Sequence, residues 1–433
     1  MRAFTRQARP IAAALAAGMV LAACGTDATD DAAAEEPVEE PVEDETVTDE
    51  PVEEEEAETE DDHDMDEMET VAVDLSAEQL RATLNRLFQE HVYLAGTATG
   101  QALAGNDEAF EAASAALTEG NTEDLADLIG AVYGDDVREQ FVGFWNSHIG
   151  MFVDYTVATA EGDEAAQDDA VERLLGYSQE LADTFETLTE GELPASASQP
   201  GIEMHVTTLK AAVDAQAAGD AELAFSNLRE AAHHMDNLAE ALANAIATQN
   251  GLEGDATSDL AGVQSELNGL LQEHVYLAGT FTGEVLTGGD NVEAAQNALI
   301  GGNTEDLADL VADVYGERTD RDEFVQFWNS HILMFVAYTE GVAADDQDAK
   351  DAAVADLVSY GDDLAAAFEE LTAGELPAEA STPLIVEHVT TLLPAIDAQG
   401  EGDFTAAYTE LRTAAGHMEM LTFPLFDATV ASL

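Results

Sequence analysis

The chain repeats itself at two spacings, and these spacings constrain its fold more than any other feature. The segment QEHVYLAGT at 89–97 returns unchanged at 272–280. His91 thereby returns as His274, and three later histidines of the first half return in the second half at the same offset. Within each half, the first three of these repeated histidines are also equally spaced. The long repeat indicates a duplicated domain, and the short one indicates that each domain contains three similar units.

Helical periodicity runs through both halves. In the opening stretch, apolar residues and one histidine follow one another at steps of three and four, which is the period of one helix face: Leu80, Leu84, Leu87, His91 and Leu94. No stretch alternates with a period of two and is rich in β-branched residues, as a strand would be. We therefore predict an all-α fold of two tandem helical bundles, each of about six helices built as three helical hairpins.

Local signals mark the ends of several predicted helices. Ser76 and Gln79 have the spacing of a capping box, so the first helix should begin there. Asn121 or Thr122 is the expected cap of a later helix that ends at Gly134. The predicted segments are a signal peptide at 1–23, an acidic tether at 24–73, bundles at 74–248 and 259–433, and a linker at 249–258.

The N-terminal segment predicts export and a lipid anchor. Arg2, Arg6 and Arg9 precede an apolar run that is too short to span a membrane in the mature protein. The run ends in LAAC at 21–24, which resembles the bacterial lipobox. That resemblance implies lipidation of Cys24, attachment to a membrane through the lipid, and an extracytoplasmic location. Residues 27–70 contain no Lys or Arg and repeat the motif PVEE, so we expect a disordered tether.

The charge balance narrows the choice of partners. The chain has 91 Asp and Glu residues against 13 Lys and Arg residues, a formal net charge of −78. Such a protein is not expected to bind nucleic acid, because both would be strongly negative. Life in high salt is our interpretation, since salt screens the self-repulsion of the acidic surface. The sequence does not identify a protein partner.

The repeated histidines fall on apolar helix faces, and hairpin geometry predicts that they meet at one level of each bundle. Converging imidazoles suit zinc, copper, nickel or iron, and we predict about one such ion per domain. Four neighbouring residues should support the ligands without touching the ion: Glu90, Tyr177, Glu273 and Tyr360. The expected metal ligands are His91, His148, His205 and His234 in the first domain, and His274, His331, His388 and His417 in the second.

Two alternatives to a metal site remain open. The histidines can form a structural polar layer in a module that serves structure or protein interaction. Haem is less favoured, because the single cysteine excludes a CxxCH attachment and a bis-histidine haem would need a slot between helices. Glu230 and His233 have Glu-x-x-His spacing, but Gly416 stands at the repeat position of His233, so we interpret this match as chance. No catalytic motif is present, so no enzyme activity is predicted.

The motifs EHVYLAGT, DLADLIGAVYG, FWNSHI and HHMDNLAEAL resemble those of uncharacterised bacterial helical proteins. Those proteins open with a Glu-His-Val helix and close with a Met-Ala-Asp helix, and the resemblance covers most of each predicted bundle. The chain departs from their pattern at Tyr93, where tryptophan is usual, and at Asp236-Asn237. The resemblance implies a helical fold and no particular activity.

Overall fold

The computed structural model describes residues 75–433, which belong to one compact unit. These residues form helices and the loops between them, with no strand in this range, so the all-α prediction is confirmed. The predicted signal peptide, Cys24 and the tether, which contains one further histidine, His63, lie outside the described residues.

The first helix, α1 (Ala77–Ala104), begins at the predicted capping box. The Ser76 hydroxyl accepts a hydrogen bond from the Gln79 amide at 3.2 Å, and the Gln79 side chain accepts one from the Ser76 amide at 3.0 Å. The helix ends at Gly105, whose φ of 71° is the left-handed conformation that favours glycine. The first repeat continues with α2 (Asp107–Ala115), the π-helical segment η1 (Ala116–Asn121), α3 (Thr122–Tyr133), α4 (Asp135–Glu161), α5 (Glu164–Leu188), α6 (Ala195–Ala218), α7 (Ala221–His233) and α8 (Met235–Asn250).

The second repeat follows the same order with small differences. Its last helix is continuous, whereas the corresponding stretch of the first repeat is divided at His234 into α7 and α8. Its elements are α9 (Asp259–Thr287), α10 (Val292–Gln296), the π-helical segment η2 (Asn297–Asn303), α11 (Thr304–Tyr315), the 3₁₀ turn η3 (Gly316–Arg318), α12 (Arg321–Ala343), α13 (Gln347–Leu371), α14 (Ala378–Glu401) and α15 (Phe404–Ser432).

The predicted helix cap at Asn121 or Thr122 is wrong. Both residues lie where η1 runs directly into α3, in helical conformation and with no side-chain cap. The Asn121 side chain instead donates to the Leu87 carbonyl at 2.9 Å and to Glu90 at 3.0 Å. The wide π turn replaces a break in the helix, and such turns are often found at functional sites.

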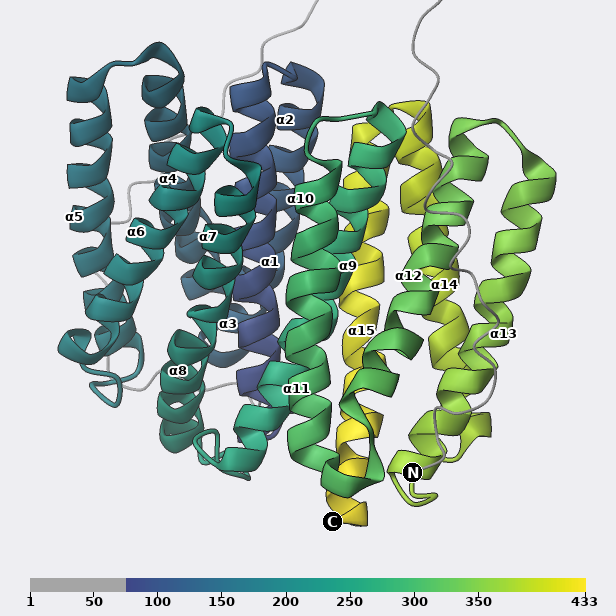
Figure 1. Cartoon of the computed structure of the whole chain (residues 1–433). Helices are drawn as coiled ribbons and strands as arrows, with labels where there is room; N and C mark the ends of the chain where they lie inside the picture. The colour runs from purple at the N-terminus through teal and green to yellow at the C-terminus, as the bar shows by residue number, and fades with distance from the viewer. Residues whose placement is uncertain (1–74) are drawn as a thin grey trace, which may run out of the picture. The chain divides into compact units, whose positions relative to one another are not determined.

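The two repeats pack together along their first helices. Figure 1 shows α1 and α9 side by side, and these two helices are central among the described helices, with α2–α8 and α10–α15 around them. Buried amides join these two helices: Asn85 donates to the Ser265 carbonyl and Asn268 donates to the Ala82 carbonyl, both at 3.2 Å. One continuous set of buried apolar side chains includes residues of both repeats.

Candidate functional site

The first three histidines of each repeat are buried on three different helices. In the first repeat, α1, α4 and α6 carry His91, His148 and His205, which are 2–7% exposed. Their counterparts in the second repeat lie on α9, α12 and α14 and are 1–8% exposed: His274, His331 and His388. Burying three imidazoles in each repeat is costly unless their nitrogens find partners.

Two imidazoles in each repeat face each other directly. The Nε2 atoms of His91 and His148 are 3.2 Å apart, and those of His274 and His331 are 3.1 Å apart. Two nitrogens bound to one zinc-like ion at 2.0–2.1 Å in tetrahedral geometry would be about 3.3 Å apart. The spacing of both pairs therefore suits a hydrogen bond or a shared metal ion.

A third histidine lies beside each pair. The His205 ring centroid is 6.0 Å from that of His91. In the second repeat, His388 is close enough to His274 and His331 to interact with both electrostatically. Within residues 75–433, however, no three His, Cys, Asp or Glu side chains stand together as a complete metal site. The structure thus shows two ligand-spaced imidazoles per repeat and a third nearby.

The fourth histidine of each repeat makes other contacts. His417 Nε2 lies 3.0 Å from the Leu384 carbonyl oxygen, so this imidazole donates to the backbone. His234 lies at the junction of α7 and α8, with Nε2 3.9 Å from a carboxylate oxygen of Glu230. Neither histidine joins the facing pair of its repeat in this structure.

A small cavity of about 20 Å³ lies at the first histidine group, with room for roughly one water molecule or ion. His91, His148, His205, Trp145 and Tyr177 are among its lining residues. The Tyr177 ring stacks on His148 at 4.8 Å, and Tyr360 stacks on His331 at 5.1 Å. The Tyr177 hydroxyl and the Trp145 Nε1 have no hydrogen-bond partner among the described residues.

The second ring nitrogen, Nδ1, of one imidazole in each pair lies away from the other imidazole and near a backbone carbonyl oxygen, which can only accept. His331 Nδ1 contacts the Trp328 carbonyl. The Trp145 carbonyl acts to raise the pKa of His148, but His148 Nδ1 makes no full hydrogen bond among the described residues. A backbone carbonyl only accepts, so the contact with Trp328 assigns the proton of His331 to Nδ1 and leaves its Nε2 as a lone pair.

For the other imidazole of each pair, the nearby acceptor is the side-chain oxygen of an asparagine. Asn303 Nδ2 donates to the Leu270 carbonyl and to Glu273, both at 2.8 Å, which fixes the amide with its oxygen on the opposite side. The Asn303 amide acts to raise the pKa of His274, against the larger lowering by burial. His274 Nδ1 and the Asn303 oxygen do not, however, meet in full hydrogen-bond geometry. Asn121 is held by Leu87 and Glu90 and acts on His91 in the same way.

These surroundings leave the neutral His274–His331 pair with one unfavourable contact. If His274 protonates Nδ1 toward Asn303, two bare Nε2 lone pairs face each other at 3.1 Å. If it protonates Nε2 toward His331, its Nδ1 lone pair faces the Asn303 oxygen instead. A cation between the two Nε2 atoms removes the conflict, because both lone pairs then have a partner and His274 can carry its proton on Nδ1, toward the Asn303 oxygen.

A proton is a poor candidate for that cation. Burial lowers the pKa of His148 to about 3, of His205 to about 4, of His274 to about 4 and of His388 to about 3. Burial, together with neighbouring imidazoles, holds the pKa of His91 and His331 well below the usual value. The sites are therefore neutral near pH 7 and offer lone pairs.

Glu90 and Glu273, expected to support the ligands, are buried at 1% and 0% exposure. Each accepts a hydrogen bond from the asparagine that interacts with the adjacent histidine. Each also pairs with an arginine, at 2.9 Å in both cases: Arg412 with Glu90 and Arg229 with Glu273. Glu273 is additionally 3.3 Å from His233, the residue whose Glu-x-x-His spacing is interpreted above as chance.

Sequence reasoning missed the residues that hold these two carboxylates. Arg229 and Arg412 occupy the same repeat position in a chain with only 13 Lys and Arg residues, which is a usable signal. Tyr93 and Tyr276 recur inside the repeated EHVYLAGT segment. Periodicity could place each of them on a helix, but it could not show which carboxylate each one contacts.

Comparisons with protein-family models, with curated proteins and with solved structures found no match to the chain. Among the described helices, none combines the length and apolar character needed to cross a membrane.

Proposed function

We propose that each repeat is a helical bundle of three hairpins that binds one transition-metal ion, for sequestration, delivery or sensing. His91, His148 and His205 hold the ion in the first repeat. Their counterparts His274, His331 and His388 hold it in the second. His234 and His417 stand at the edge of the two sites.

The observation that carries the proposal is the facing pair of buried, neutral imidazoles, whose Nε2 atoms lie at the spacing of two ligands of one ion. The arrangement occurs twice, at 3.2 Å and 3.1 Å, and in the second repeat His331 also contacts the Trp328 carbonyl through Nδ1. Metal-bound histidines commonly donate their second nitrogen to a carbonyl or carboxylate in this way.

The donor set favours borderline transition metals. Imidazole nitrogen suits zinc, copper, nickel and iron, whereas calcium and magnesium prefer oxygen ligands. Each ion would bring positive charge into a buried site whose ligands are neutral. Glu90 and Glu273, one asparagine away from a ligand, supply a compensating negative charge.

The proposed location rests on the sequence alone. A lipid on Cys24 anchors the chain to a membrane, and the acidic segment 24–73 holds the bundles away from that surface on the extracytoplasmic side. The net charge of −78 favours neither nucleic acid nor an anionic surface as a partner.

Metal titration of the purified full chain tests the function. We expect about two ions per chain for the wild type, one for His148→Ala, one for His331→Ala and none for the double variant. The matched control is His63→Ala, which removes a histidine outside both groups and should leave two ions. Binding that is unchanged in the double variant would refute the proposal.

A structural role without metal is the second candidate, and the His417 contact favours it. That buried imidazole is already satisfied by the Leu384 carbonyl at 3.0 Å, as a structural polar residue would be. If the role is purely structural, the wild type binds no ion with useful affinity, and His148→Ala only loses stability through the cavity and stranded partners.

A further inference from the structure

The contacts of the two buried carboxylates cross from one repeat to the other. Glu90 of α1 accepts a hydrogen bond from the Tyr276 hydroxyl of α9 at 2.7 Å. It also pairs with Arg412 of α15, whose guanidinium reaches on to Asp124 of α3 at 2.5 Å. The tyrosine and the arginine that donate to Glu90 therefore both belong to the second repeat.

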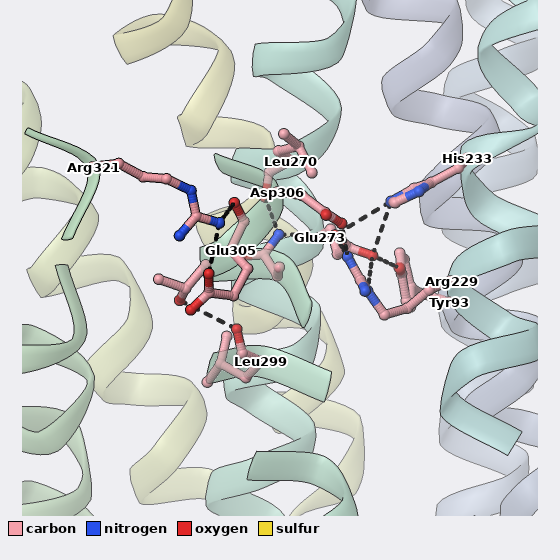
Figure 2. A network of polar contacts seen from close by, with 11 residues as sticks. Tyr93, Arg229, His233, Leu270, Glu273, Leu299, Glu305, Asp306 and Arg321 are labelled. Atoms are coloured by element: carbon pink, nitrogen blue, oxygen red, sulfur yellow. Dashed lines mark hydrogen bonds and ion pairs between the residues drawn. The ribbon is translucent and has the colours of Figure 1, made fainter. Parts of the chain in front are cut away.

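The equivalent network surrounds Glu273 of α9, and Figure 2 shows it. The Tyr93 hydroxyl of α1 donates to Glu273 at 2.5 Å, and Arg229 of α7 forms two bonds to it, at 2.9 Å and 3.1 Å. Arg229 continues to Asp306 of α11 at 2.6 Å. The two tyrosines, Tyr93 and Tyr276, stack on each other with ring centroids 5.7 Å apart and planes 7° apart.

The π-helical segments make room for the crossing arginines. A Cβ on Gly120 would lie 2.2 Å from Arg412, and a Cβ on Gly302 would lie 2.4 Å from Arg229. The residue after each glycine is the asparagine that donates to the carboxylate and acts on the pKa of the nearby histidine. The glycine thus admits the opposite repeat's arginine to the carboxylate, and the asparagine beside it bonds to the same carboxylate.

From these contacts we infer that each histidine site takes its outer support from the opposite repeat. The first site depends on Tyr276 and Arg412, through Glu90 and Asn121. The second depends on Tyr93 and Arg229, through Glu273 and Asn303. These are positioning residues, because none of them reaches the facing imidazoles. The inference deepens the proposed metal binding and rests on it.

The physical basis is the orientation of the imidazole. Tyr276 and Arg412 hold the Glu90 carboxylate in place, and that carboxylate fixes the asparagine amide whose oxygen acts on His91. If the Glu90 carboxylate is held less firmly, the Asn121 amide and the His91 imidazole next to it become free to rotate. Loss of such outer partners typically lowers metal affinity by about 10–100-fold.

The test uses full-length variants that keep one site at a time. His331→Ala removes the second site and keeps only the first. His148→Ala removes the first site and keeps only the second. Tyr276→Phe and Tyr93→Phe are then added separately to each background, and zinc affinity is measured by competition with a chelator. Phenylalanine keeps the stacked ring and removes only the hydroxyl, so the two tyrosine variants serve as matched controls for each other.

If each site depends on the tyrosine of the opposite repeat, the four measurements give a distinctive pattern. Tyr276→Phe should weaken zinc binding about tenfold or more when only the first site remains, and Tyr93→Phe should leave that site unchanged. When only the second site remains, the two effects should exchange. Equal effects of both variants on both sites, or a dependence of each site on its own repeat's tyrosine, would overturn the inference.

A metal-free measurement separates this inference from the proposed function. The ¹⁵N chemical shifts of the imidazoles report which ring nitrogen carries the proton. In protein without metal, Tyr276→Phe should change the shifts of His91 and leave those of His274, and Tyr93→Phe should do the reverse. If zinc does not bind but these crossed shifts appear, metal binding fails and crossed support stands. If zinc binds but the shifts do not cross, crossed support fails alone.

Discussion

At the scale of single residues, hydrogen-bond direction matters more than the number of histidines. Buried imidazoles alone are compatible with an ordinary core. What distinguishes these is that two Nε2 atoms face each other at 3.1–3.2 Å, while Nδ1 of His331 contacts the Trp328 carbonyl, which can only accept. That arrangement leaves lone pairs facing inward, which a cation can satisfy.

The lowered histidine pKa values predict how stability depends on pH in metal-free protein. In the unfolded chain a histidine titrates near 6.5, but in the folded protein the pKa of His148 is about 3 and that of His205 about 4. Between these values the unfolded chain binds more protons, so stability falls as pH falls below about 6.5. The slope approaches about 1.4 kcal/mol per pH unit for each such histidine.

Urea unfolding at about pH 7 and about pH 5, with a chelator present, measures this effect. The double variant His148→Gln with His331→Gln should lose less stability over the same interval. His233 has the opposite sign: partial burial of this 40% exposed side chain lowers its pKa, but Glu273 outweighs that effect and raises the pKa overall. Its contribution to stability therefore grows as pH falls, and His233→Ala should make the decline steeper. A wild type equally stable at both pH values contradicts the prediction.

At the scale of elements, the π-helical segments η1 and η2 connect the packing to the sites. Each one inserts a wide turn between two α-helical stretches, which carries a buried asparagine toward α1 or α9. It also places a glycine under an arginine from the other repeat. An ordinary helix turn with a larger side chain would block that arginine.

Substituting Gly120 with Ala tests the close approach. Alanine in a helix normally stabilises relative to glycine, by about 0.5–1 kcal/mol. At Gly120 the added methyl group displaces Arg412 from the buried Glu90 carboxylate, so we expect a loss of about 1–3 kcal/mol instead. The free energy of unfolding from urea titration measures the change.

The matched control is Gly143→Ala on α4. Gly143 is exposed and helical, and a Cβ there would meet nothing within 4 Å. This variant should be slightly more stable than the wild type. The same direction of change for Gly120→Ala would show that Arg412 gives way without cost, and that the glycine is not required.

At the scale of the whole molecule, two features determine stability: the large excess of acidic residues and the packing of the two repeats against each other. The 13 Lys and Arg residues cannot balance 91 Asp and Glu residues. Two of these arginines are committed to the buried carboxylates between the repeats, Arg229 and Arg412. Most of the remaining acidic side chains repel one another across solvent.

Salt should therefore stabilise the folded protein. Raising the ionic strength from dilute buffer to molar salt screens the repulsion between exposed carboxylates, whose range in dilute buffer exceeds about 10 Å. We expect the melting temperature, measured by circular dichroism, to rise over this range. A flat or falling curve in sodium chloride removes the interpretation of life in high salt.

Membrane attachment is the second prediction at this scale. If a lipid on Cys24 is the anchor, Cys24→Ser should move the protein from the membrane fraction to the soluble extracytoplasmic fraction of cells. Fractionation followed by immunoblotting measures the change, and Ser258→Ala serves as a control variant that leaves the anchor untouched. Equal membrane retention of Cys24→Ser and the wild type means that the anchor lies elsewhere.

The sequence by itself determined the helices and the repeat. The step of three and four residues from Leu80 to Leu94, the capping box at Ser76 and the turn at Gly105 are local signals, and the structure contains the corresponding helix. The equal spacing of the histidines also placed His91 and His148 on different helices of one repeat. These features follow from short-range geometry, which the sequence carries directly.

Only the tertiary structure decided how the sites are supported. Asn121 has the sequence context of a helix cap, yet in the structure it binds Glu90 because η1 continues the helix. Arg412 of the last helix meets Glu90 of the first, and Arg229 meets Glu273 of the other repeat. Such contacts depend on how α1 packs against α9, and helical periodicity holds no information about which face of one repeat meets the other.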